Sequence, residues 1–329
     1  MTLVCQVLHR LDRWQQRTPV LGVPVAVLKK FLDDGVNRLG VQVAYWAFFS
    51  VFALLLAFAS ILGFVFQNNP DLQHELIDST LERLPVIGPQ IRGDVGSLTG
   101  SGVALAVGII GALWTGLGVT LAIGNALDRI WAVPATERRG FVSSRLRGLL
   151  VLTVVGTVNV VATAAVGIVA AGKGPGALTS VLSVIASAAF DFALFAGSFR
   201  WLTAATVTMR VVRPGALVAT AVWLALQFLG GVFVTQVLAG SSQTYGGFAA
   251  VVGLLSWLLI SAELILIAAE LNVVLARKLW PRSLTGDLLE ADKRVLNDLA
   301  RSAQLDRRQQ ITVRFGKRPD GRGDPEGGA

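Results

Sequence analysis

Long stretches without Asp, Glu, Lys or Arg dominate the hydrophobic pattern of this chain. A membrane-spanning helix needs about 20 predominantly apolar residues. Several stretches reach that length, and the last, residues 214–262, is long enough for two crossings divided by the turn-forming segment 240–247. The pattern therefore predicts six spans, near residues 41–66, 102–124, 148–172, 176–199, 215–238 and 246–275.

The positive charges predict the orientation of these spans. If the spans alternate, 26 of the 29 Lys and Arg residues fall on one side of the membrane. Lys and Arg are enriched in loops that stay in the cytoplasm. The expected fold class is therefore all-α: a polytopic membrane protein with six transmembrane helices, both termini in the cytoplasm and an outer loop at 67–101. We expect it in a bacterial plasma (inner) membrane.

Composition supports a membrane protein over a soluble one. Hydrophobic residues make up 53% of the 329 residues and charged residues 15%, against roughly a quarter charged in soluble domains. The net charge of +8 follows the predicted topology, so we expect membrane lipids rather than nucleic acid as partners. One cysteine and two distant histidines, His9 and His74, predict no disulfide, metal site or cofactor.

Two regions flank the predicted membrane domain, residues 41–280. Residues 1–40 form a basic arm in which apolar residues recur at helical spacing, namely Val25, Leu28, Leu32, Val36 and Leu39. Such a helix lies either on the inner leaflet or on the cytoplasmic ends of the protein itself. Residues 281–329 form a tail with an amphipathic helix expected over 287–305 and disorder after about 316. A further short helix is expected over 70–84 in the outer loop.

Three segments resemble the YihY/BrkB family of bacterial inner-membrane proteins. The first is FLDDGVNRLGVQVAYWAFFSVFALLLAF, residues 31–58, and the second is LWTGLGVTLAIGNALDRIWAVPATERR, residues 113–139. The third combines PGALVATAVW, residues 214–223, with TYGGFAAVVGLLSWLLISAELILIAAELNVVLAR, residues 244–277. The order and spacing of these segments carry the resemblance, although Ala53 and Ala269 replace the proline and glycine typical of the family.

The resemblance implies six spans with both termini inside, in agreement with the charge distribution. It also implies a role in serum resistance and cell-envelope physiology, with transport suggested. Many members carry the label ribonuclease BN. This sequence lacks a His-x-His-x-Asp-His motif, and its two histidines fall on opposite sides of the predicted membrane. We therefore expect no enzyme activity.

Acidic residues within the predicted spans are the first candidate functional residues. An ionisable side chain at the bilayer centre costs about 2.5–3.5 kcal/mol on insertion scales, so it normally faces protein or water. Asp191 and Glu263 are expected at similar depths, where they would share a central cavity. Glu270 follows Glu263 by two helical turns, and Asn159 is a possible neutral partner. The alternative is structural, in which Glu270 bonds a neighbouring span or pairs with an interfacial arginine.

Small residues and arginines near the second span provide two further sets of candidate functional residues. A ridge suited to close helix packing, or alternatively to a homo-oligomer seam, consists of Gly100, Ala104, Gly108, Ala112, Gly116, Thr120 and Gly124. Candidate contacts for anionic lipid headgroups are Arg129, Arg138, Arg139, Arg145 and Arg147. In a simpler interpretation, these arginines only mark the cytoplasmic side of the membrane. Arg129 is also placed to form an ion pair with Asp128.

The functional hypothesis from these features is transport of a lipid-like or small amphipathic envelope substrate. No GxxxxGK[ST] motif for nucleotide phosphates is present, so transport would be passive, ion-coupled or driven by a partner. The alternative is a non-transporting membrane scaffold in cell-envelope organisation. An intramembrane enzyme is a weaker third hypothesis, because no pairing of a nucleophile with a base is evident.

Overall fold

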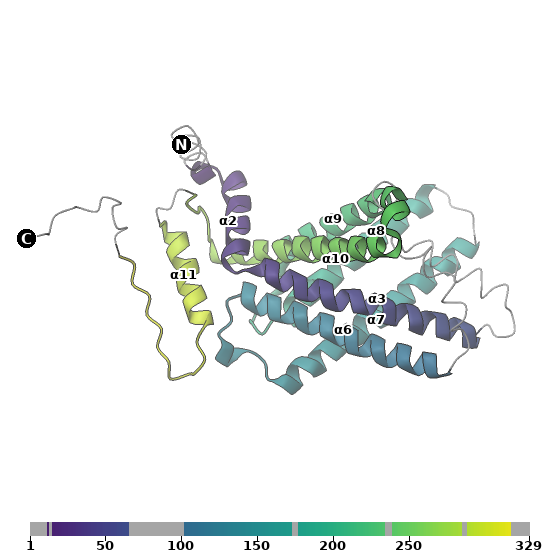
Figure 1. Cartoon of the computed structure of the whole chain (residues 1–329). Coiled ribbons are helices and arrows are strands. Elements are labelled where there is room, and N and C mark those ends of the chain that lie inside the picture. Colours follow the sequence, from purple (N-terminus) through teal and green to yellow (C-terminus); the bar gives the residue numbers. More distant parts are fainter. Residues whose placement is uncertain are drawn as a thin grey trace, which may run out of the picture.

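The computed structural model describes residues 12, 15–65, 102–172, 177–233, 239–284 and 288–316 (Figure 1). All regular elements in these ranges are helical. They are α2 (Pro19–Asp33), α3 (Val36–Val65), α6 (Gly102–Ile130), a short 3-10 turn (Ala135–Glu137), α7 (Phe141–Gly172), α8 (Ala177–Trp201), α9 (Met209–Phe233), α10 (Ala239–Arg277) and α11 (Glu290–Ser302). The outer loop at 67–101 and the tail beyond 316 lie outside the described residues.

Six of these helices, α3 and α6 to α10, are long and apolar enough to cross a membrane. This confirms the predicted all-α class with six apolar helices. One predicted boundary was wrong: α10 begins at Ala239, so residues 240–247 are helical rather than a turn. Backbone groups in apolar surroundings need internal hydrogen bonds, which favours a helix even through Gly and Ser. The connection between α9 and α10 falls at 234–238, outside the described residues.

The helices pack unevenly around α10, which contacts α2, α3, α6 and α9. Helices α3 and α6 pack side by side along much of their length, and α8 packs on α9. Glycines permit the closest approaches: Gly108 of α6 faces the backbone of Ala57, and Gly118 faces the ring of Trp46. Helix α7 contacts α6 and, more sparsely, α8. It therefore lies at the edge of the bundle.

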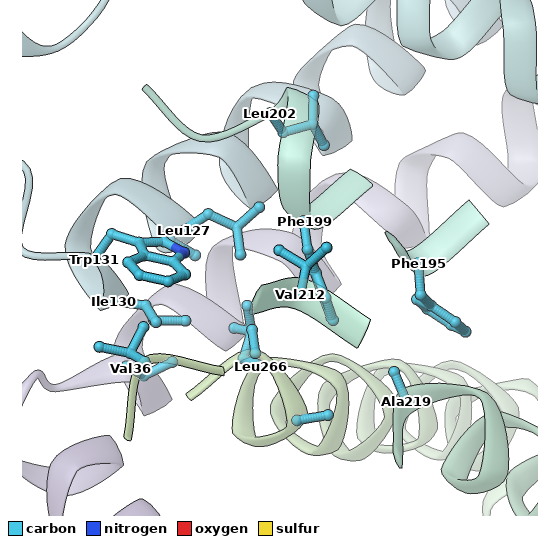
Figure 2. Close-up of a cluster of buried hydrophobic side chains, with 14 of the residues drawn as sticks. Val36, Leu127, Ile130, Trp131, Phe195, Phe199, Leu202, Val212, Ala219 and Leu266 are labelled. Atoms are coloured by element: carbon cyan, nitrogen blue, oxygen red, sulfur yellow. The ribbon is translucent and has the colours of Figure 1, made fainter. Parts of the chain in front are cut away.

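The hydrophobic core is concentrated at the end of the bundle near α2 and α11 (Figure 2). Eight helices, α2, α3 and α6 to α11, supply buried side chains to it, including Val36, Leu127, Ile130, Phe199, Val212 and Leu266. Farther along the helices, large apolar side chains such as Val103, Ile110 and Phe228 are exposed. A helix that exposes apolar side chains over this length suits a lipid environment.

Helix α2 and the segment after α10 are joined by buried polar contacts. The Asp292 carboxylate of α11 accepts hydrogen bonds from Lys29 at 2.8 Å and from Arg282 at 2.6 Å. Arg282 also pairs with Asp33 at 2.7 Å. Burial disfavours the charge on Asp292, but these two cations outweigh it and lower the pKa of that carboxyl. The arm and the tail thus form one unit at this end of the bundle.

The crossing of α9 and α10 brings together the two parts of the third family-like segment. Pro214 lies inside α9, and the backbone N–H of the next residue, Gly215, donates to Asn272 Oδ1 at 2.7 Å. A Cβ atom at Gly215 would collide with the carbonyl oxygen of Ala268 and with the Asn272 amide. The glycine is therefore required by the closeness of the two helices.

We predict that Gly215→Ala destabilises the protein by about 1–3 kcal/mol, because the added methyl group overpacks the α9–α10 crossing. Thermal unfolding in detergent, followed by circular dichroism, measures this as a lower Tm. Gly156→Ala in α7 is the matched control, because a Cβ there meets nothing within 4 Å. It should keep or raise the Tm, since alanine favours a helix more than glycine does. Equal losses in both variants would contradict the packing argument.

Candidate functional site

A buried ion-pair triad links α2 to the membrane helices. The Lys30 ammonium lies 2.9 Å from Glu270 Oε2 and 2.5 Å from Asp34 Oδ2. It also donates a hydrogen bond to the Ile130 carbonyl at 2.8 Å, at the C-terminal end of α6. All three charged residues are buried. Glu270 therefore pairs with a lysine of the arm, not with an arginine at the membrane interface as one alternative held.

Local sequence explains how α2 presents this lysine. Lys30 and Asp34 are four residues apart, so they lie on one face of the helix. Gly35 then adopts a φ of 64°, which favours glycine and turns the chain from α2 into α3. Burial alone would lower the pKa of Lys30, but Glu270 and Asp34 outweigh it and raise that pKa above its ordinary value. Lys30 is therefore held in its charged form.

Sequence reasoning missed Lys30 because the apolar stripe that it identified does not include the face of α2 that packs on α10. In the predicted apolar stripe, Leu28 and Leu32 are exposed, whereas Ala26 and Val27 on the adjoining face are buried against Val274 of α10. Of the two interpretations of the arm, packing on the protein itself describes this buried face. The i, i+4 spacing of Lys30 and Asp34 was the available signal, but it also occurs in exposed helices.

The other membrane acids do not join the triad. Glu263 is half-buried and lies against Gly40 of α3. Asp191 is half-buried on α8. None of the three acids lines either of the two cavities beside α7 and α8. The cavity expected between Asp191 and Glu263 therefore stays a prediction, and the Asn159 side chain lies outside the described residues.

The arginines near the second span mostly bind carbonyl groups of the protein. Arg139 donates to the carbonyls of Leu202 at 3.0 Å and of Thr203, and Arg147 donates to that of Trp201 at 3.2 Å. These contacts stabilise the C-terminal end of α8, where carbonyls lack helical partners. Burial and the neighbouring Arg147 lower the pKa of Arg139.

The remaining arginines also have protein partners. Arg138 donates to the Val133 carbonyl at 3.2 Å, and the Arg145 guanidinium lies 3.3 Å from the centre of the Phe141 ring. Asp128 and Arg129 take separate partners instead of the expected mutual pair. Asp128 accepts hydrogen bonds from Thr203 and Ala204, and Arg129 donates to the Asp34 carbonyl at 3.3 Å, with a longer contact to Ser302.

The small-residue ridge meets several neighbours within the chain. Gly108 faces α3, Gly116 faces Leu152 of α7, and Gly124 faces the Leu202 carbonyl. Thr120 lies opposite Gly148 of α7, and Ala112 is half-buried. Gly100 and the side chain of Ala104 lie outside the described residues. At the three glycines, the close approach accommodates intrachain packing, and a homo-oligomer seam stays a prediction.

An apolar groove separates α7 from α8. One cavity of about 200 Å³ is lined mainly by apolar side chains of the two helices, among them Val151, Val154, Val158, Phe190, Ala193 and Leu194. A wider cavity of about 680 Å³ shares Val151 and Trp201 with it and extends to Ser143 and Arg147. Together they form one groove that is apolar along its length and has a cation at one end.

Comparison with known proteins agrees with this fold. A sequence profile of the family described as "Virulence factor BrkB" matches residues 27–287. The chain belongs to this BrkB family. The match includes Lys30, Asp34 and Glu270, and it confirms the resemblance inferred from the three segments. Six long apolar helices in a membrane-protein family indicate that this BrkB protein is a multi-pass membrane protein.

One curated relative is similar over part of the chain. It is YfkH of Bacillus subtilis (strain 168), which is named a ribonuclease-like protein and is 27% identical over 194 residues. The alignment covers 54% of this BrkB protein and 68% of YfkH. No solved structure matches.

We predict that Lys30→Met strongly destabilises this BrkB protein, whereas Glu270→Gln has a small effect. Removing the lysine leaves two carboxyl groups buried without a cation, which typically costs about 3–5 kcal/mol. Glutamine at 270 leaves the Lys30–Asp34 pair balanced. Thermal unfolding of the two variants in the same detergent measures the difference. If both variants lost the same stability, the triad would not be the unit that joins α2 to α10.

Proposed function

We propose that this BrkB protein binds an anionic, lipid-like amphipathic molecule and moves it across the bacterial inner membrane, with both termini in the cytoplasm. The observation that carries the proposal is the groove between α7 and α8, which is apolar along its length and bordered by Arg147 at one end. This arrangement matches the two parts of such a molecule. An acyl chain would lie along the valines, and the headgroup would lie near the arginines.

The position of the groove favours a membrane lipid as the occupant. Helix α7 lies at the edge of the bundle, and Val154, Val158 and Leu150 beside the groove are exposed. A lipid would enter sideways from the bilayer without passing through water. Trp201 and Arg147 lie at the end of the groove assigned to the cytoplasmic interface, where tryptophan and basic side chains are enriched.

A route for the headgroup would require polar groups at membrane depth. Asp191 follows Phe190, a groove residue, on the same helix, and Glu263 is the second candidate for this route. An acidic side chain at this depth is energetically unfavourable unless it contacts water, a cation or another polar group. We therefore assign Asp191 and Glu263 to the path and the arginines to the inner rim.

We predict that Ala193→Trp removes bound lipid from this BrkB protein, because Ala193 lines the groove and the larger side chain fills it. Native mass spectrometry after gentle purification measures the retained lipid. Val107→Trp is the matched control, since Val107 is exposed on α6.

The double variant Asp191→Asn/Glu263→Gln tests the path of the headgroup. In liposomes, it should move a fluorescent anionic lipid between leaflets at least about tenfold more slowly than wild type, which corresponds to a barrier about 1.4 kcal/mol higher.

The outcomes distinguish the proposal from a scaffold. A selective lipid that wild type and Val107→Trp retain and Ala193→Trp loses would support the groove as the binding site. Unselective lipid at equal levels in all three proteins, with no movement between leaflets, would overturn the transport proposal. The scaffold in cell-envelope organisation would then be favoured.

A further inference from the structure

The triad of Lys30, Asp34 and Glu270 contains one cation and two acids in a closed environment. The exposed fractions of the three side chains are 4%, 2% and 0%. With every group ionised, the triad carries one unbalanced negative charge. A buried charge without a partner is strongly unfavourable, so a triad packed in this way needs one more positive charge.

The hydrogen bonds indicate where that charge is missing. Lys30 donates to Asp34 Oδ2 at 2.5 Å and to the Ile130 carbonyl at 2.8 Å. Neither carboxyl oxygen of Glu270 accepts a well-aligned hydrogen bond from the described residues, although Lys30 lies within ion-pair distance. Glu270 is therefore the fully buried acid whose oxygens are least satisfied.

The surrounding elements provide no second cation to the triad within the described residues. On α2, Lys29 and Asp33 point to Asp292 and Arg282. On α6, Arg129 binds the backbone carbonyl of Asp34 and not a carboxylate. On α10, Arg277 is paired with Asp298, and Glu263 is a further acid. Arg38 of α3 and the α9 arginines Arg210 and Arg213 are exposed.

We propose that the triad is a proton-binding site, with the proton carried on the Glu270 carboxyl when α2 is packed against α10. Binding forms one O–H bond on Glu270 at the expense of one in a hydronium ion, and no other bond changes. The charge of the triad then falls from minus one to zero. Loss of the proton restores the unbalanced charge and favours entry of water between α2 and α10.

With Glu270 protonated, Lys30 keeps the Asp34 carboxylate as its anionic partner at 2.5 Å, so the remaining pair is balanced. The site also gives the proposed transport a coupling ion, namely the proton. That step rests on the proposed function, whereas proton binding itself does not require the α7–α8 groove to hold a lipid.

Infrared spectroscopy of the full chain in lipid nanodiscs tests the site directly. A protonated carboxylic acid shows a carbonyl stretch that an ionised carboxylate lacks. We expect wild type to show this band and to lose it as the pH is raised from about 5 to about 10, a range that spans ordinary and strongly raised carboxyl pKa values. Other carboxyl groups contribute to such a band near pH 5, so the signal of Glu270 is the part that is present in wild type and absent from Glu270→Gln.

Two further variants make the test specific. Glu263→Gln lies two turns away on the same helix and should keep the band, with loss at the pH seen in wild type. Asp34→Asn removes one negative charge, so Lys30 and ionised Glu270 balance without a proton. The band should then disappear at a pH at least about one unit lower, a tenfold weaker binding of the proton. If Glu270→Gln does not fold, the pH at which Asp34→Asn loses the band still tests whether Glu270 binds the proton.

The proposal would be overturned if the difference between the wild-type and Glu270→Gln spectra contained no such band at any pH, or if Asp34→Asn lost the band at the same pH as wild type. Failure here is separable from failure of the lipid proposal. A titrating band in a protein that retains no groove lipid would leave the proton site standing without the substrate. Retained groove lipid without the band would leave the substrate without the coupling ion.

Discussion

The Lys30 ammonium, which lies between Glu270 and Asp34, is the contact on which the end of the bundle near α2 and α11 depends. It joins the arm helix α2, the C-terminal end of α6 and the interior of α10 at one point. A buried ion pair of this kind contributes little net stability relative to apolar packing, but removing one partner is strongly unfavourable. Its effect is therefore to specify one position of α2. The second set of contacts, from Lys29 and Asp33 to Asp292 and Arg282, then ties the tail to the same helix.

The two ends of the helices differ in packing for a physical reason. Near α2 and α11, buried apolar side chains from six membrane helices interlock, and buried ion pairs join α2 to α10 and α11. Away from that end, the helices expose valine, isoleucine and phenylalanine. Lipid is as apolar as these side chains, so little hydrophobic force draws the helices together there. The sparse contact between α7 and α8, and the groove between them, are consistent with this.

The arginines show how the same residues can serve topology and structure. Their placement follows the enrichment of positive charge on one side of a membrane. In the fold, Arg139 and Arg147 also donate to free carbonyls at the end of α8, and Asp128 accepts hydrogen bonds from residues just beyond it. A segment whose arginines predict the orientation thus also stabilises the start of the α8–α9 connection beside the groove.

The sequence by itself determined the membrane class, the six apolar helices and the family, because these depend on hydrophobicity over about 20 residues and on motifs in fixed order. It also identified Glu270 as unusual, since an acid in an apolar run stands out without knowledge of its neighbours. Only the tertiary structure decided the partner of Glu270, because Lys30 lies 240 positions away in the chain and resembles a surface lysine until α2 is placed. The start of α10 and the groove between α7 and α8 were likewise decided by packing and backbone hydrogen bonding, which local composition does not reveal.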